Sequence, residues 1–366
     1  MKNRLYFVYP YKFLPADFVR FDLFFLAKFV PITIVCPNWK EMEESYKYPN
    51  IFTISPAKFL ITPLDKKSHA FWIFCEGFGA LDFLINLRLI FSQIAVLRHY
   101  APGLPPTLVF KNTKKLPKIH SLRYLYFAIF RILSSRIRFL ENSTCFVAGS
   151  YWSEEFKQKS SNVRSSISYD VNIYGVIEKT RTRRDKKYMI FLDGAYGFGS
   201  DSMIFGRKLP VTRNSFYKFL STLLSDIETR TGCSVICVSH PKRRNTKYAN
   251  WGLEGFESWS EDWQKLVPEC SAVISVNSTA IVCGILEYKP IILINPKRQW
   301  PDFGGGAEDQ EVLQQWLGCA MIGAVNDDFS LNVETQKYDN FLELFHKGAD
   351  LPKDVRLGGQ ILDAIR

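Results

Sequence analysis

The feature that most constrains the fold of this chain is the alternation, in its second half, of short apolar runs with helical segments. Residues 188–192, 234–239 and 272–275 are short runs rich in apolar residues, as expected of buried strands. Residues 215–231 lie between the first two runs and have the periodicity of a helix. Strands and helices that alternate in this way form mainly parallel sheets covered by helices. The sequence therefore predicts an α/β fold.

The same pattern predicts the remaining elements and two domains. Further strands are expected at 5–8, 32–36, 144–148 and 290–294, and further helices at 71–97, 121–140, 260–267 and 277–287. A length of 366 residues is long for one domain and suits two. We therefore expect an N-terminal domain (1–177), a polar and basic linker (178–187, EKTRTRRDKK), a C-terminal domain (188–342) and a C-terminal helical segment (343–366). The expected architecture is two Rossmann-like domains with a cleft between them.

The charge balance indicates an anionic partner. The 47 Lys and Arg residues outnumber the 36 Asp and Glu residues, for a net charge of +11. Such a chain suits nucleic acid, an anionic lipid or a phosphorylated sugar donor. No motif typical of RNA- or DNA-binding proteins is present, so no nucleic-acid partner is expected.

The cysteines and the apolar segments indicate a cytoplasmic protein. The eight Cys residues form no CxxC pair, and most lie inside apolar runs, as do reduced thiols of cytosolic proteins. The start of the chain does not have the pattern of a signal peptide, and no stretch reaches about 18 uninterrupted apolar residues. With five His residues and none beside a Cys at ligand spacing, no metal site is expected.

A carboxylate follows the predicted strand at 188–192 and leads into a glycine-rich loop. The sequence is YMIFLDGAYGFGSD, in which Asp193 ends the strand and Asp201 follows eight residues later. Ligands of open α/β sheets bind at the carboxyl ends of strands, so both carboxylates are candidate catalytic groups. Gly194 and the later glycines allow a tight turn and the close approach of a substrate. The alternative for Asp193 is an ordinary turn or helix cap.

The strand at 234–239 ends in a histidine and a group of cations. His240 can donate a hydrogen bond to a phosphate oxygen, and Pro241 fixes the backbone direction after it. Lys242 and Arg243 add positive potential. The alternative is a strand cap followed by a solvated basic loop.

Polar residues also open the helix expected after the strand at 272–275. Asn277, Ser278 and Thr279 combine side-chain donors with free backbone N–H groups, which together can bind a phosphate. The alternative is a plain N-cap by Asn277 or Ser278. Glu308 follows three glycines and is a candidate contact to a ribose or sugar, with a surface acid as its alternative.

These motifs together resemble those of the bacterial retaining β-Kdo transferases, which are GT-B enzymes of capsule and O-antigen assembly. The similar features are the FLD strand end with Asp201 after it, the strand that ends in HP, and the Ser/Thr-rich helix start before KPIILI (289–294). The stretch ISYDVNIYG (167–175) resembles the end of the first domain in the same families. The resemblance covers about residues 165 to 295. The sequence differs where it has glycines before the second Asp, in place of the Pro and His of the Kdo enzymes.

The resemblance implies transfer of Kdo or a related ulosonic or nonulosonic acid from a CMP-activated donor to a bacterial surface glycan. Asp193 would form a glycosyl-enzyme adduct, with Asp201 as the second carboxylate. His240 and the Ser278/Thr279 helix start would hold the CMP phosphate, and Gly194 and Glu308 would contact the donor. No metal or other cofactor is expected. The N-terminal domain would take the acceptor.

One further expectation concerns a membrane. Residues 121–140 combine aromatic residues with four arginines, a composition suited to peripheral contact with the inner face of the cytoplasmic membrane, where a lipid-linked acceptor would be presented. The alternative is an ordinary buried helix whose arginines extend to the surface.

Three other functions remain open from the sequence. An inverting sialyltransferase-like enzyme would use Asp193 as a general base and would be distinguished by product stereochemistry. A CDP-polyol phosphotransferase would be distinguished by its donor. A non-catalytic GT-B scaffold in polysaccharide assembly would tolerate the loss of Asp193.

Overall fold

The computed structural model describes residues 4–9, 12–73, 80–100, 143–158, 162–176, 187–196, 211–240, 243, 251–259, 262–276, 278–301, 303, 307–348, 350–352 and 354–366. They form two compact units, each built around its own parallel sheet. The first unit holds the described residues of 1–103 and 119–176 together with Glu343–Arg366, and the second holds those of Ile177–Leu342.

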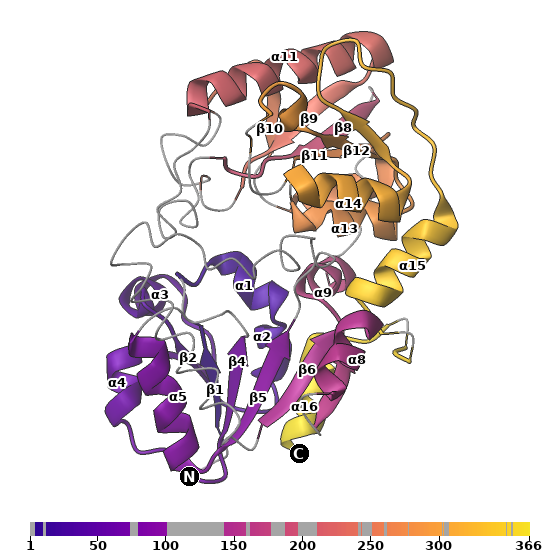
Figure 1. Ribbon diagram of the computed structural model, residues 1–366. Coiled ribbons are helices and arrows are strands. Elements are labelled where there is room, and N and C mark those ends of the chain that lie inside the picture. Colours follow the sequence, from indigo (N-terminus) through magenta and orange to yellow (C-terminus); the bar gives the residue numbers. More distant parts are fainter. Residues whose placement is uncertain are drawn as a thin grey trace. The chain divides into compact units, whose positions relative to one another are not determined.

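The first unit contains a seven-stranded parallel sheet in the order β3-β2-β1-β4-β5-β6-β7 (Figure 1). Its described strands are β1 (Leu5–Val8), β2 (Ile32–Val35), β3 (Ile51–Ile54), β4 (His69–Ile73), β5 (Ala95–Tyr100), β6 (Ser143–Ala148) and β7 (Val163–Ser166). Its described helices are α1 (Pro15–Arg20), α2 (Leu23–Leu26), α3 (Trp39–Ser45), α4 (Pro56–Ile61), α5 (Ala80–Ser92), α8 (Ser150–Lys157), α9 (Tyr169–Val176) and α16 (Leu357–Ile365).

Both faces of this sheet are buried, because alternate residues of each strand point to opposite sides. Leu5 and Phe7 of β1 belong to a cluster with residues of α1, α2 and α16. Tyr6 and Val8 belong to a second cluster with residues of α4 and α5. The helices therefore form one layer on each side of the sheet, as expected for an α/β unit.

The predicted helix at 71–97 is wrong. The structure has β4 over His69–Ile73, α5 over Ala80–Ser92 and β5 over Ala95–Tyr100. β4 and β5 pair with each other and lie in the middle of the sheet, where strands are apolar on both faces. A strand of this kind has no alternation of polar and apolar residues, so its sequence cannot be told from part of a buried helix.

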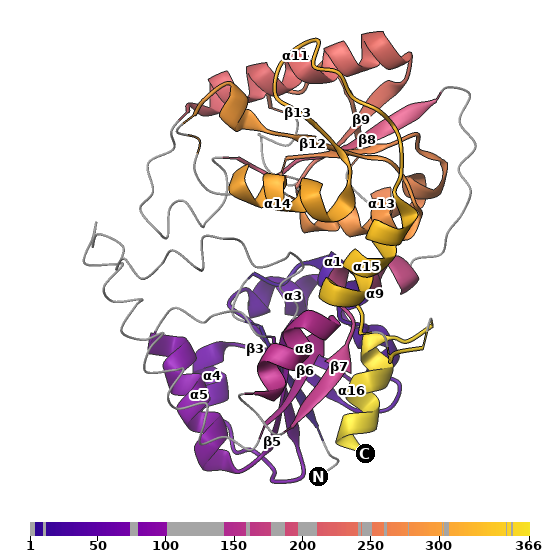
Figure 2. The same cartoon turned by 45° about the vertical axis from the view of Figure 1, so that its right-hand side comes forward.

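The second unit contains a six-stranded parallel sheet in the order β10-β9-β8-β11-β12-β13. Its strands are β8 (Tyr188–Leu192), β9 (Ser234–Val238), β10 (Glu257–Trp259), β11 (Val273–Ser275), β12 (Ile291–Ile294) and β13 (Ala320–Ile322). The helix α11 (Arg213–Thr231) covers one face, and α13 (Val282–Leu286) and α14 (Ala307–Leu317) lie on the other (Figures 1 and 2).

The local sequence explains why α11 forms where it does. Thr212 is its N-cap, and its hydroxyl accepts a hydrogen bond from the backbone N–H of Ser215 at 3.2 Å. Gly232 ends the helix with φ 67°, in the left-handed region that glycine adopts readily. Six apolar or aromatic residues along one side of α11 are buried against the sheet: Phe216, Tyr217, Leu220, Leu223, Leu224 and Ile227. The prediction of a helix at 215–231 is confirmed.

All seven strand predictions are also confirmed. Those at 5–8, 32–36, 144–148, 188–192, 234–239, 272–275 and 290–294 correspond to β1, β2, β6, β8, β9, β11 and β12. In place of the helix at 260–267, the structure has a 3₁₀ helix, η1 (Trp263–Glu269). The helix predicted at 121–140 lies outside the described residues. Across those residues, no helix combines the length and apolar character needed to cross a bilayer.

The C-terminal segment returns to the first unit. Ile167, just after β7, pairs with Lys347, and the backbone N–H of Ser168 donates to the carbonyl oxygen of His346 at 2.8 Å. The helix α15 (Thr335–Phe345) therefore contains residues of both units. Of the predicted linker at 178–187, the structure describes only Lys187.

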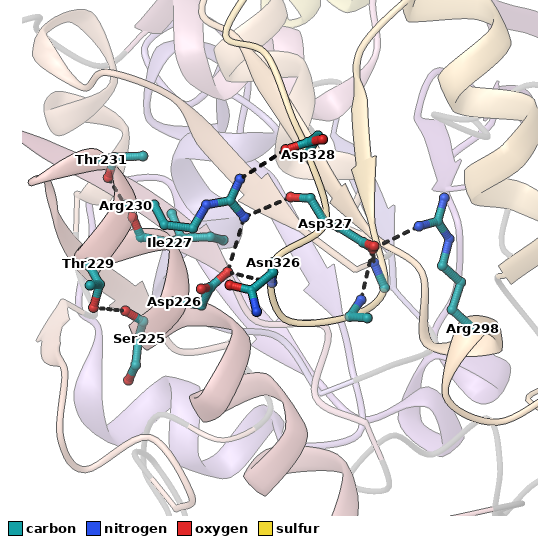
Figure 3. Close-up of polar contacts among 12 residues, drawn as sticks. Ser225, Asp226, Ile227, Thr229, Arg230, Thr231, Arg298, Asn326, Asp327 and Asp328 are labelled. Carbon is teal, nitrogen blue, oxygen red and sulfur yellow. Dashed lines mark hydrogen bonds and ion pairs between the residues drawn. The ribbon is translucent and has the colours of Figure 1, made fainter.

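Charged side chains tie the loop after β13 to α11 (Figure 3). Arg230 donates to the Asp226 carboxylate at 3.2 Å and to the carbonyl oxygen of Asp327 at 2.7 Å. Asp327 also forms an ion pair with Arg298 at 2.8 Å and accepts hydrogen bonds from two backbone N–H groups of the loop. Although partial burial acts to raise the pKa of Asp327, these donors outweigh it and lower the pKa. The loop is thus held in place by Arg230 and by Arg298.

Burial of His99 makes the stability of the protein dependent on pH. Its side chain is 0% exposed, and its Nε2 lies 3.0 Å from the carbonyl oxygen of Ile167. Burial lowers the pKa of His99 to about 3, so the unfolded chain takes up a proton at higher pH than the folded protein does. We therefore expect the free energy of unfolding to fall by roughly 1 kcal/mol per pH unit below about pH 6.5.

Urea unfolding of the wild type and of His99→Gln between pH 7.5 and 5 measures this effect. Carboxylates titrate mainly below that range, so the difference between the two proteins isolates the contribution of the histidine. Equal pH dependence in both proteins would show that His99 does not carry the effect.

Candidate functional site

The structure places the three predicted motifs at one edge of the second sheet. β8 lies between β9 and β11 and is parallel to both, with Leu192 opposite Val238 on one side and Ser275 on the other. Asp193, His240 and Ser278 follow these three strand ends at the carboxyl edge of the sheet, where ligands of α/β folds bind. β9 and β11, which carry the two phosphate motifs, are not neighbours, because β8 separates them.

Asp193 lies in a buried ion pair with Arg243. The two residues are 4% and 1% exposed. The Asp193 carboxylate accepts hydrogen bonds from the backbone N–H of Ala195 at 3.0 Å and from the Tyr217 hydroxyl at 2.9 Å, and its other oxygen pairs with Arg243. Its negative charge is therefore satisfied from three directions within the protein.

Arg243 is held as firmly as its partner. Its second terminal nitrogen donates to the carbonyl oxygen of Trp251 at 3.0 Å, and its guanidinium lies 4.7 Å from the centre of the Tyr217 ring. Burial and the Asp193 carboxylate raise the pKa of Tyr217, so the tyrosine stays a hydrogen-bond donor. In this arrangement the predicted phosphate-binding cation faces the interior, toward the predicted catalytic carboxylate. Whether either residue contacts a ligand stays a prediction.

His240 is half-buried and directly follows β9 and Ser239. Its carbonyl oxygen accepts a hydrogen bond from the backbone N–H of Arg243 at 2.8 Å, which closes a turn after the strand. The buried pair of Arg243 with Asp193 therefore also fixes the turn that carries the histidine. Pro241 and Lys242 lie outside the described residues.

Ser278 begins a short turn rather than a long helix, so the helix predicted at 277–287 is wrong in its first part. The structure has a 3₁₀ turn, η2 (Thr279–Ile281), followed by the short α13. The Ser278 hydroxyl accepts from the backbone N–H of Ala280 at 3.3 Å, and its own N–H donates to the Ser275 hydroxyl at 3.0 Å. This is the capping role given above as the alternative. Asn277 lies outside the described residues.

Gln310 also lies at this edge, although the sequence motifs did not predict it. It lies in the first half of α14, is 1% exposed, and its side-chain nitrogen donates to the carbonyl oxygen of Val276, just after β11. Its side-chain oxygen is buried and has no hydrogen-bond partner among the described residues. A buried acceptor without a donor is unfavourable, and a bound ligand could supply one. The sequence signal that could have pointed to Gln310 is its position soon after three glycines.

The structure describes only some of the other predicted site residues. Gly194 is half-buried in the loop after β8, and Asp201 lies outside the described residues. Glu308 lies on α14, and its side chain is not among those described. Within the described part of the chain, no group of three or more His, Cys, Asp or Glu side chains could hold a metal ion.

Comparison with known proteins identifies the fold. No protein-family model and no curated protein sequence matches the chain. Among solved structures, the glycosyltransferase SnogD from Streptomyces nogalater matches with a TM-score of 0.55 and 9% identity over 100% of both chains. S. aureus MnaA with UDP matches at 0.53 and 10% identity, over 99% of this chain and 96% of the other. UDP-GlcNAc 2-epimerase from Methanocaldococcus jannaschii matches at 0.52 and 11%, over 99% of both chains.

At such low identity, the similarity concerns the fold alone. Both parallel sheets and almost the whole chain are covered by these matches. The predicted fold class, with two Rossmann-like domains, is confirmed: the chain has a GT-B fold.

Proposed function

We propose that the protein is a glycosyltransferase that uses a nucleotide-activated sugar, and that its donor is a CMP-activated Kdo or related ulosonic or nonulosonic acid. The observation that carries the proposal is the convergence of Asp193, His240 and Ser278 at the carboxyl edge of one sheet in a GT-B fold. The choice of CMP rests on the resemblance of the three motifs to the β-Kdo transferases. The UDP in MnaA makes UDP the competing nucleotide to test.

The donor phosphate is proposed to lie at this edge of the second unit. The His240 imidazole would donate to a phosphate oxygen, and Lys242, Asn277 and Thr279 would complete its surroundings. The unpartnered oxygen of Gln310 would accept a hydrogen bond from the donor, which would remove the unfavourable burial of that atom. Gly194 and Glu308 remain proposed donor contacts. No metal or cofactor is proposed.

The proposed mechanism retains configuration through an aspartyl glycosyl-enzyme adduct. A carboxylate oxygen attacks the anomeric carbon while the bond to the CMP phosphate breaks, and an acceptor hydroxyl then displaces the carboxylate. If Asp193 is the nucleophile, its carboxylate must first exchange its contacts with Arg243 and Tyr217 for the substrate. Asp201 is the second carboxylate in the proposal. Asp201 can take the role of nucleophile in place of Asp193, with Asp193 then as the second carboxylate.

The acceptor is proposed to be a bacterial surface glycan, free or lipid-linked, taken by the N-terminal unit. Peripheral contact of residues 121–140 with the cytoplasmic membrane stays part of this proposal. Intact-protein mass spectrometry with donor and no acceptor tests the covalent step, because an adduct adds the mass of one sugar to the peptide that contains the nucleophile.

His240→Ala is expected to weaken CMP binding by about 10- to 150-fold. A lost hydrogen bond to a charged group is worth roughly 1.5–3 kcal/mol, which corresponds to that range. Calorimetric titration with CMP measures it, and titration with UDP tests the nucleotide. The same samples are then incubated with CMP-sugars and acceptor, and CMP release is measured.

His69→Ala serves as the matched control, since His69 begins β4 of the first unit, far along the chain from the proposed donor residues. It is expected to leave CMP binding unchanged. Unchanged affinity in His240→Ala, or tight binding of UDP in place of CMP, would contradict the proposed donor site.

A further inference from the structure

An open cavity of about 170 Å³ lies on the surface of the first unit, whereas the sheet edge discussed above belongs to the second unit. Apolar side chains dominate its walls, and charged groups stand among them: Phe18, Val19, Asp22, Phe24, Phe25, Lys28, Val176 and Arg356. These residues come from α1, from α2 and the residues that flank it, from the end of α9 and from the residue before α16. Three separate parts of the chain, residues 18–28, Val176 and Arg356, therefore build the cavity.

A close approach of backbone and side chains shapes this cavity. Asp22 has φ 56° and turns the chain between α1 and α2. Gly358 lies so near that a Cβ added there would be 2.7 Å from the Asp22 carboxylate and 2.9 Å from the Phe25 ring. Arg356 donates hydrogen bonds to the Asp22 carboxylate from two nitrogens, one of them at 3.0 Å. Its guanidinium also lies 5.0 Å from the centre of the Phe25 ring.

The charge left at the cavity is positive. Asp22 is the one acidic residue among the described lining residues, and Arg356 neutralises it. Lys28 adds a second cation at the same cavity. An anion is therefore favoured here.

Exposed aromatic rings continue the apolar wall beyond the cavity. Phe29 is 54% exposed and its ring lies 5.2 Å from that of Phe25. Tyr48 is 47% exposed and its ring lies 4.3 Å from that of Phe24. Arg366, at the end of α16, lies 6.0 Å from the centre of the Phe29 ring. Apolar rings and cations thus alternate on one surface, as in sites that bind amphipathic anions.

We propose that this cavity binds an anionic lipid, with the phosphate at Lys28 and an apolar segment among Phe18, Phe24 and Phe25. A cavity of about 150 Å³ can hold benzene, so this one has room for one isoprene unit or a short alkyl segment. The inference extends the proposed function by naming a site for the lipid that carries the acceptor. Only this role of the lipid as the acceptor's carrier rests on the proposed function. Binding itself requires neither donor nor transfer.

The test uses the full-length protein and a water-soluble lipid, dihexanoyl phosphatidic acid below its micelle concentration, titrated by calorimetry. Lys28→Glu is expected to weaken binding at least tenfold, because it places a like charge beside the phosphate. Lys58→Glu on α4 is the control: it makes the same change in net charge, but α4 packs against the other face of the sheet. It should leave binding unchanged.

Three results would overturn the inference. Equal weakening by Lys28→Glu and Lys58→Glu would show attraction by net charge alone. Inorganic phosphate that binds as tightly as the lipid would show an anion site without a lipid role. If the protein sediments with phosphatidylglycerol vesicles but does not bind the monomeric lipid, the protein has a membrane-binding surface and not a lipid pocket. CMP titration of Lys28→Glu separates this proposal from the donor site, which should be unaffected.

Discussion

Replacing Arg243 with methionine is expected to reduce the free energy of unfolding by about 3–5 kcal/mol, because it leaves the buried Asp193 carboxylate without its counter-ion. Tyr217 and the backbone N–H of Ala195 still donate to the carboxylate, but neither carries a positive charge. The measurement is the shift in urea midpoint, followed by circular dichroism. Since the chain has two units, the transition that involves the second unit is the one to compare.

The double variant Asp193→Leu/Arg243→Met is expected to recover much of the loss, since it removes both charges together. Arg298→Met is the matched control, because Arg298 pairs with Asp327 near the surface and its side chain is 49% exposed. Such exposed pairs contribute about 0–1 kcal/mol. Equal destabilisation by Arg243→Met and Arg298→Met would contradict the special role of the buried pair.

Gly149→Ala is expected to destabilise the first unit by roughly 3–5 kcal/mol, from the sum of backbone strain and overpacking. Gly149 has φ 80° and ψ 147°, a conformation that residues with a Cβ rarely adopt. An added Cβ would also collide with the carbonyl oxygen of Leu344 and approach the Phe345 Cα to 2.6 Å. Both obstacles are backbone atoms, which cannot move aside as a flexible side chain can. Thermal unfolding of the variant measures the effect.

Gly175→Ala provides the control within the same unit. Gly175 lies in α9, and an added Cβ would meet no atom within 4 Å. Because alanine favours a helix over glycine by about 0.5–1 kcal/mol, this variant should be as stable as the wild type or slightly more so. A Gly149→Ala protein as stable as Gly175→Ala would show that the end of α15 can move away from β6.

Local patterns predicted most of the second unit correctly. β8 and β9 are short apolar runs bounded by polar residues, and α11 has a capping threonine at its start and a glycine at its end. These signals lie within a few residues of the element they define, so they can be read without tertiary contacts. The arrangement of polar motifs at strand ends follows from them, because parallel strands share one carboxyl edge.

The first unit was harder to predict for a physical reason. β4 is buried on both faces, so the residues over 71–97 read as one helical pattern, although the structure divides them among β4, α5 and β5. The capping turn at Ser278 shows the same limit, since a helix start and a 3₁₀ turn share their first residues.

By itself the sequence determined the α/β class and the strand ends at which Asp193, His240 and Ser278 stand, because these depend on neighbours in the chain. Only the tertiary structure decided which partners their side chains have. Asp193 and Arg243 are 50 residues apart, and Asp22 and Arg356 are 334 apart. A charged side chain that is buried without a partner is strongly unfavourable, so it needs a counter-ion. Here each counter-ion comes from a distant part of the chain, so only the way in which these segments pack decides whether the charged side chain faces solvent or a buried partner.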